Sequence, residues 1–170
     1  MFFFRIFGAI KPNKVMNHRL LPIFFMLFCT SICTAQTFEL KKEHDSLYYI
    51  NGWRLPYPVY QFQTGDVDGD GRDDAIVGVI KGTRFYPEKA RRIFIFKQVN
   101  GKARPLWLGS KLGGILKDFR YIDGVIRALE STTDGRYVVS DYRWGGFGMN
   151  FDHYLIKDVD MQTAIKTFSQ

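Results

Sequence analysis

The chain has 170 residues, of which 46% are hydrophobic, 16% aromatic and 24% charged. This length holds one domain with or without a leader, and it excludes a multidomain enzyme or a closed eight-stranded α/β barrel. The composition is typical of a globular chain and not of a disordered one. The formal net charge of +7 suggests a nucleic-acid partner until the N-terminal segment is considered separately.

Residues 1–35 have the organisation of a secretory signal peptide. An apolar run of 14 residues, Leu20–Cys33, follows several basic residues and precedes the small residues Thr34 and Ala35. These are the three parts that export and cleavage need, so we expect export to the periplasm or the extracellular space, with cleavage after Ala35. The run is shorter than the roughly 20 residues of a spanning helix, which favours cleavage over an uncleaved anchor.

Two details of the leader stay open. Met16 begins a complete leader by itself, so translation starts either at Met1 or at Met16. Cys29 and Cys33 suggest the alternative of a lipoprotein, although the bulky residue before each cysteine disfavours acylation. Both cysteines lie in the leader, so we expect no disulfide and no thiol chemistry in the mature chain.

The basic charge belongs partly to the leader. Residues 1–35 contain four of the 24 Lys and Arg residues and no acid, which leaves 20 basic residues against 17 acidic ones and a net charge of +3. No mature segment has the dense Lys/Arg stripe that follows a phosphate backbone. We therefore expect no nucleic-acid partner, and membrane contact only through the leader before cleavage.

Residues 57–163 have the pattern of an antiparallel β domain. Short runs rich in Val, Ile, Phe and Tyr are separated by turn dipeptides that favour two-residue hairpins, namely Asn100-Gly101, Asp123-Gly124 and Asp134-Gly135. We predict eight strands: Val59–Gln63, Asp74–Ile80, Arg92–Gln98, Ala103–Leu108, Ile115–Ile122, Val125–Glu130, Tyr137–Arg143 and Asn150–Ile156.

The eight strands fall into two successive sets of four, separated by Gly109–Gly114. We therefore predict an all-β fold of two four-stranded antiparallel sheets, similar to propeller blades and arranged as a half-propeller or a compact sandwich. Residues 36–56 are predicted to be an N-terminal arm, in which Phe38–Leu47 forms a short helix or an extended segment. Residues 164–170 are predicted to be a frayed C-terminal tail.

Residues 66–74 carry the alternating acids of a calcium loop. They read Asp-Val-Asp-Gly-Asp-Gly-Arg-Asp-Asp and lead into an apolar strand. Ca²⁺ takes six to eight oxygen ligands, and alternate residues of a tightly curled loop direct their carboxylates to one centre. We predict Ca²⁺ as a cofactor, bound by the side chains of Asp66, Asp68, Asp70 and Asp74 and the carbonyl of Arg72. The alternative is a metal-free turn, in which the crowded carboxylates would repel one another.

The segment Thr64–Ile80 resembles the calcium loops of FG-GAP and VCBS repeats, in which D-x-D-G-D-G-x-x-D precedes an apolar strand of an integrin-type β-propeller. The second set of strands lacks the alternating acids, around Asp118–Gly124, so the resemblance implies a single calcium site. A complete propeller needs at least four blades, and this chain has strands for two. Either the two sheets pack against each other, or several chains complete a ring.

A second resemblance is to periplasmic lysozyme inhibitors that act as immunity proteins against secreted cell-wall hydrolases. It rests on a calcium loop followed by Tyr- and Phe-rich strands and C-terminal hairpins in a small exported protein. Such inhibitors insert a loop into the hydrolase cleft, and the resemblance implies that Trp144, Phe147 and Met149 contact the partner. The alternative for this Gly-rich segment is a flexible hairpin that covers the edge of the core.

The sequence carries no catalytic motif such as G-x-S-x-G, H-E-x-x-H or a phosphate-binding glycine loop. Glu43-His44-Asp45 and Asp152-His153 are clusters of neighbours in sequence and carry little weight as sites. We therefore expect a binding protein and not an enzyme, with a protein or a glycan of the cell envelope as its partner and with oligomerisation left open.

Four aromatic residues suggest a glycan-binding alternative. Trp53, Tyr57, Tyr60 and Trp107 form either a face on which sugars stack or a part of the hydrophobic core, which is the commoner role of aromatic residues at this density.

Overall fold

The structure is a computed structural model, and it describes residues 37–170. The predicted leader and its cleavage site lie outside the described residues. Within residues 37–170, no helix combines the length and the hydropathy that crossing a bilayer requires.

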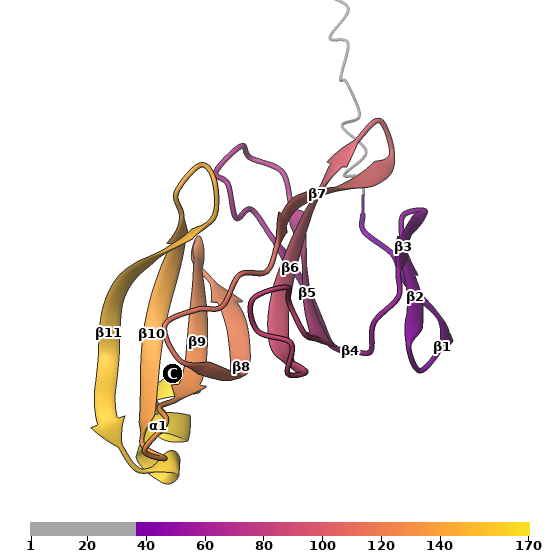
Figure 1. The fold of residues 1–170 in the computed structure, drawn as a ribbon. Helices are drawn as coiled ribbons and strands as arrows, with labels where there is room; N and C mark the ends of the chain where they lie inside the picture. Colours follow the sequence, from indigo (N-terminus) through magenta and orange to yellow (C-terminus); the bar gives the residue numbers. More distant parts are fainter. Residues whose placement is uncertain (1–36) are drawn as a thin grey trace, which may run out of the picture. The chain divides into compact units, whose positions relative to one another are not determined.

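The described chain is all-β with one short helix at its end (Figure 1). The strands are β1 (Leu40–His44), β2 (Leu47–Ile50), β3 (Trp53–Leu55), β4 (Val59–Gly65), β5 (Asp74–Lys81), β6 (Ala90–Val99), β7 (Lys102–Leu108), β8 (Ile115–Ile122), β9 (Val125–Ser131), β10 (Tyr137–Trp144) and β11 (Met149–Val159), and the helix is α1 (Met161–Phe168). The eight predicted strands correspond to β4–β11, so the predicted fold class is confirmed.

The strands form three antiparallel sheets, in the orders β1-β2-β3, β4-β5-β6-β7 and β11-β10-β9-β8 (Figure 1). Each neighbour in a sheet is also the next strand in sequence, as antiparallel pairing allows. Most connections are short hairpins, and longer loops join β4 to β5 and β5 to β6. Two of the predicted turns have positive φ at both central residues, at Asn100-Gly101 (52° and 76°) and at Asp123-Gly124 (46° and 81°). This backbone twist matches the twist of the flanking strands.

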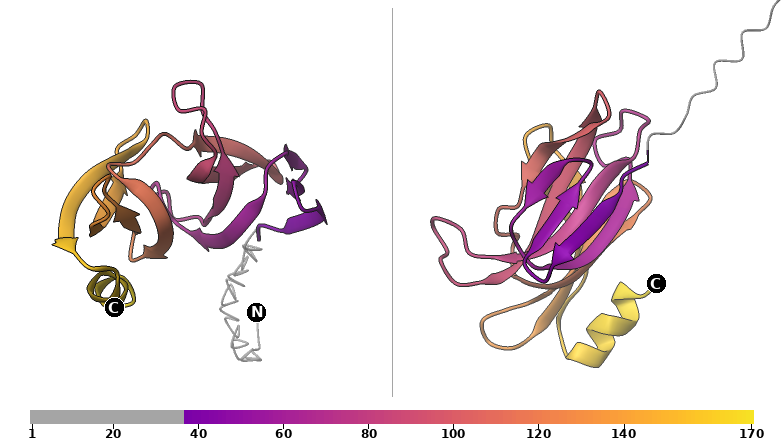
Figure 2. Two further views of the ribbon diagram at one scale, coloured as in Figure 1. Left: turned by 60° about the horizontal axis from the view of Figure 1, so that its bottom comes forward. Right: turned by 90° about the vertical axis from the view of Figure 1, so that its right-hand side faces the viewer.

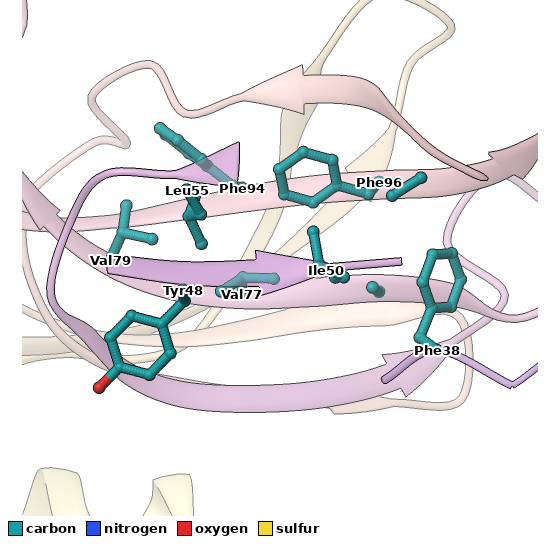
Figure 3. Packing of buried hydrophobic residues seen from close by; sticks show 10 residues of the cluster. Phe38, Tyr48, Ile50, Leu55, Val77, Val79, Phe94 and Phe96 are labelled. Atoms are coloured by element: carbon teal, nitrogen blue, oxygen red, sulfur yellow. The ribbon is translucent and has the colours of Figure 1, made fainter. Parts of the chain in front are cut away.

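The three sheets and the helix of the described domain are stacked in layers, and a hydrophobic cluster lies between each pair of neighbouring layers. The first lies between the β1–β3 sheet and one face of β4–β7, and it includes Ile50, Leu55, Val77, Phe94 and Phe96 (Figure 3). The second lies between the other face of β4–β7 and the β8–β11 sheet. The third lies between the outer face of β8–β11 and α1, which Figure 2 shows in yellow beside that sheet.

Strand β5 is buried from Asp74 to Val79 because both of its faces are covered. Val77 and Val79 belong to the first cluster, and Ile76 belongs to the second. This explains why the strand reads as a continuous apolar run and does not alternate with polar residues. The acidic loop 66–73 therefore leads directly into the centre of the fold.

The structure differs from the predicted arm at residues 36–56, where the three strands β1–β3 form a sheet of their own. Its inner face contributes Tyr48, Ile50 and Leu55 to the first cluster. Asn51-Gly52, with φ of 39° and 81°, makes the β2–β3 turn. This is the same turn dipeptide that marks the later hairpins, and it was the available signal for the additional sheet.

The C-terminal end also differs from the predicted tail, because helix α1 spans Met161–Phe168. The Asp160 side chain caps it by accepting a hydrogen bond from the Thr163 amide at 3.0 Å. Ala164 and Phe168 are buried against Leu129 and Val139 of the last sheet. The end of the chain is therefore held by packing.

Candidate functional site

The loop between β4 and β5 is shaped by the side chain of its first acid. One Asp66 carboxylate oxygen accepts hydrogen bonds from the amides of Gly69 (2.8 Å) and Asp70 (3.0 Å), and the other accepts one from Gly71 (2.8 Å). Gly69 and Gly71 have φ of 76° and 81°, which glycine adopts without steric cost. The glycines of the motif are thus required by the curl of the backbone around Asp66.

The curled loop brings three of the four predicted carboxylate ligands together. Oxygens of Asp66, Asp68 and Asp74 lie within 4.8 Å of one another. Asp70 is not part of this group. Its carboxylate accepts a hydrogen bond from the Arg72 amide at 3.0 Å and forms an ion pair with Lys97, also at 3.0 Å. Arg72 itself is exposed at the tip of the loop.

Asp74 is the buried member of the cluster, with 1% of its surface exposed. One of its carboxylate oxygens accepts a hydrogen bond from the Val67 amide at 3.0 Å. Burial raises the pKa of Asp74 to about 6, because removal from water disfavours the charged form. A cation at the cluster would favour the charged form again, and the three carboxylates supply the hard oxygen ligands that Ca²⁺ prefers. The three carboxylates would therefore supply part of the oxygen shell of a calcium ion.

Lys97 of β6 is the side chain at this site that the sequence did not predict. Its ammonium group forms ion pairs with Asp68 and with Asp70. The hydrogen bonds to these carboxylates raise the pKa of Lys97, and the bond to Lys97 lowers the pKa of Asp70. The protein thus holds a positive charge of its own beside the predicted ligands. No local sequence pattern predicts the contact between Lys97 and Asp68, since these residues are 29 positions apart in sequence.

The loop also contacts the third sheet. The Tyr121 hydroxyl, at the end of β8, donates a hydrogen bond to the Asp66 carbonyl at 2.7 Å. The Tyr121 amide donates to the Gln63 side chain at 2.8 Å, just before the loop. Tyr121 also packs against Gly65, where any Cβ atom would overlap its ring. Order in the loop is therefore coupled to the contact between β4 and β8.

The predicted partner residues separate into two groups. Phe147 is 96% exposed at the β10–β11 turn, which is closed by a 2.8 Å hydrogen bond from the Gly145 amide to the Gly148 carbonyl. Met149 lines an open groove next to this turn. Trp144 does not line the groove, and it packs against the second hydrophobic cluster.

The groove has a volume of about 680 Å³ and lies between the last two sheets. Its walls come from the end of β7, the connection 110–113 and the β10–β11 hairpin, and its lining residues are Leu106, Trp107, Leu108, Ser110, Lys111, Leu112, Gly113, Tyr142, Phe147, Gly148, Met149 and Phe151. Lys111 is the one charged residue among them. Sequence reasoning identified Phe147 and Met149, because they share one hairpin, and missed the parts that tertiary packing brings to them.

Hydrogen bonds hold one wall of the groove in place. The buried Glu130 carboxylate accepts bonds from the Gly114 amide (2.7 Å) and the Tyr142 hydroxyl (2.8 Å). The Tyr142 hydroxyl oxygen in turn accepts a bond from the Gly113 amide at 3.1 Å. Burial and the nearby Glu130 charge raise the pKa of Tyr142, so it stays a hydrogen-bond donor. The connection between the sheets is thus a fixed wall.

The four aromatic residues of the glycan-binding alternative are partly buried and pack against the hydrophobic clusters. Trp53 and Tyr57 pack against the first cluster, and Tyr60 and Trp107 pack against the second. The two pairs therefore pack on opposite sides of the central sheet, and of the four residues Trp107 also lines the groove.

Comparison with known proteins found no family model, no curated protein and no solved structure that matches this chain.

Proposed function

We propose that this chain is an exported calcium-binding β protein that acts as an interaction module at the cell envelope. One observation carries the calcium part of the proposal: Asp66, Asp68 and Asp74 converge at the start of the buried strand β5. Asp74 connects the acidic cluster to strand β5, since it belongs to the cluster and is the buried first residue of the strand. Calcium binding therefore stabilises the central sheet and not only a surface loop.

The calcium ion has a structural role in this proposal. The residues that would hold it are Asp66, Asp68 and Asp74, with Asp70 close by in the same loop. When bound, the ion supplies positive charge that offsets the repulsion among these carboxylates. The ordered loop then keeps the Asp66 carbonyl in place as the acceptor for Tyr121. The proposal that the protein is exported rests on the signal-peptide pattern of residues 1–35.

The test is the melting temperature in excess calcium and in chelator. A ligand that binds only the folded state adds about 2.7 kcal/mol at 100 times its dissociation constant, so chelation should lower the melting temperature by several degrees. Asp68→Ala should abolish most of this difference. Asp73→Ala is the matched control, because Asp73 belongs to the same loop and is exposed. Identical wild-type melting curves with and without calcium would refute the calcium site.

A second candidate function is inhibition of a lysozyme-like cell-wall hydrolase. The observation that favours it is the 96% exposure of Phe147 at a tight turn, since an aromatic tip of this kind suits insertion into a cleft. The test is lysis of a peptidoglycan suspension by muramidases of several classes with and without the protein. Loss of inhibition on Phe147→Ser would support this role, and unchanged lysis in all cases would exclude it for the enzymes used.

A further inference from the structure

We propose that the groove between β7 and the β10–β11 hairpin binds an extended segment of a partner protein, in which apolar side chains alternate with acidic ones. This inference rests on the proposed role as an interaction module and deepens it by naming the surface and the partner chemistry.

The first argument is the exposure of apolar side chains along the groove. Leu108 is 46% exposed, Phe147 96% and Phe151 49%, and all three line it. The Phe151 ring lies 4.7 Å from the ring of Tyr154, which is 51% exposed and continues the apolar surface along β11. Contiguous exposed apolar surface is costly in water and marks interaction sites.

The second argument is that strand edges flank the groove. In the described sheets β7 and β11 are both terminal strands, so each has one neighbouring strand. On β7 the Ala103 amide near the start of the strand donates to the Asn51 carbonyl, so the part of this edge that a peptide can reach is its Leu106–Leu108 end. Leu106–Leu108 at the end of β7 and Met149 at the start of β11 line the groove from these strands. An extended peptide can pair its backbone with such an edge while alternate side chains enter the apolar groove.

The third argument is the charge of the surface. Lys111 is the one charged side chain of the lining within the described part of the chain, and its ammonium lies 5.2 Å from the centre of the Tyr86 ring. The Lys157 ammonium likewise lies 5.6 Å from the centre of the Tyr154 ring. Among residues 37–170 no acid lines the groove, and the nearby Glu130 is buried and accepts a hydrogen bond from Tyr142. A partner segment with carboxylates complements these cations.

The chemistry of the walls favours a peptide over a glycan or an acyl chain. A sugar needs several hydrogen-bonding side chains, and most of the lining is aliphatic or aromatic, with the Tyr142 hydroxyl already bonded to Glu130 and Gly113. An acyl chain would make no use of the backbone N–H and C=O groups at the strand edges. An extended peptide satisfies both the apolar walls and the edges.

The experiment is selection of a phage-displayed library of random dodecapeptides on the full chain, followed by calorimetric titration with the enriched peptides. We expect enriched sequences that alternate apolar and acidic residues. Phe147→Ser should weaken their binding about tenfold to a hundredfold, because a buried Phe contact is lost. Lys111→Glu should weaken it about fivefold to tenfold. Proline is then placed at each of two adjacent central positions of the peptide. It should abolish binding at the position whose N–H faces the strand edge, because a ladder hydrogen bond is lost, and be tolerated at the position whose N–H faces solvent.

Lys102→Glu is the matched control, because Lys102 is exposed on the same strand β7 and does not line the groove. It should leave the affinity unchanged. Enrichment of no peptide, enrichment of basic peptides, or equal affinity for the Phe147→Ser protein would overturn the proposal. A dimer that dissociates on Phe147→Ser would also overturn it, since a second copy would then occupy the groove.

These measurements test the groove proposal and the calcium proposal independently of each other. Phe147 and Lys111 are not part of loop 66–74, so their variants should melt like the wild type and keep its response to calcium. Loss of peptide binding with an intact calcium response refutes the groove alone. Peptide binding by a protein whose melting ignores calcium refutes the calcium site alone.

Discussion

At the scale of single residues, Lys97 is a counter-charge that the protein itself supplies to the acidic loop. Its ammonium pairs with Asp68 and Asp70, so part of the negative charge is already balanced before any cation binds. A calcium ion at the same carboxylates is repelled by Lys97 or must displace it. A site with this arrangement should bind calcium more weakly than one with the same carboxylates and no lysine.

Lys97→Met should therefore raise the calcium affinity about tenfold, since two partly exposed ion pairs together contribute roughly 1 kcal/mol or somewhat more. It should also lower the melting temperature in chelator, because the carboxylates lose their counter-charge. Calorimetric titration with calcium measures the first effect and thermal unfolding the second.

Lys102→Met serves as the control for this change, because it removes an equal charge from the neighbouring strand β7 at an exposed position. Equal calcium affinity for the wild type and Lys97→Met would contradict this prediction, since it would show that Lys97 leaves Asp68 and Asp70 without a cost in free energy.

At the scale of elements, the packing of β4 against β8 connects the acidic loop 66–74 to the core. Gly65 ends β4 beneath the ring of Tyr121, and the same tyrosine donates its hydroxyl to Asp66. Gln61 adds a second link, because its side chain donates to the Phe119 carbonyl at 2.8 Å. Two strands from different sheets thus meet at the first residue of the loop.

Gly65→Ala should destabilise the fold by about 1–3 kcal/mol, because a Cβ atom there overlaps the Tyr121 ring and the strands must separate. It should also weaken calcium binding, since the Asp66 carbonyl loses its donor. Chemical unfolding at saturating and at zero calcium measures both effects. Thr64→Ala, at the exposed neighbouring position, should change neither quantity much. A Gly65→Ala protein with wild-type stability would show that the Tyr121 ring can move to make room for the added Cβ atom.

At the scale of the described domain, both outer faces of the layered sheets are protected. On β1–β3 the outward residues Lys41, Tyr49 and Arg54 pair across the strands and give that face a polar surface. On β8–β11 the outer face is covered by α1. Layered and repeated folds need such terminal caps to stay soluble. The end sheets are therefore poor candidates for completing a propeller ring with other chains.

We accordingly expect the protein to sediment as a monomer, and a chain that ends at Asp160 to self-associate. Removal of α1 exposes the apolar face around Leu129 and Val139, which Ala164 and Phe168 cover. Analytical ultracentrifugation distinguishes the two species. Ile165→Ser, on the exposed side of the helix, should leave the monomer intact. A stable oligomer of the complete chain would show that another surface drives assembly.

Local patterns explain why much of this fold was predictable. Hairpins such as β6–β7 and β8–β9 depend on turn dipeptides at Asn100 and Asp123, whose positive φ is a property of the residues themselves. The acidic loop was equally readable, since Asp66 bonds to amides three to five residues ahead of it. In both cases the partners lie close in sequence, so spacing alone carries the information.

The sequence by itself therefore determined the strands β4–β11 and the curl of the acidic loop 66–74, because each depends on neighbours in the chain. Only the tertiary structure decided which distant side chains meet them. Lys97 reaches the loop from 29 residues away, Tyr121 reaches Asp66 from 55 residues away, and the groove combines β7 with a hairpin about 40 residues later. These contacts depend on how buried sheet faces pack together, and the apolar residues of those faces specify burial without specifying a partner.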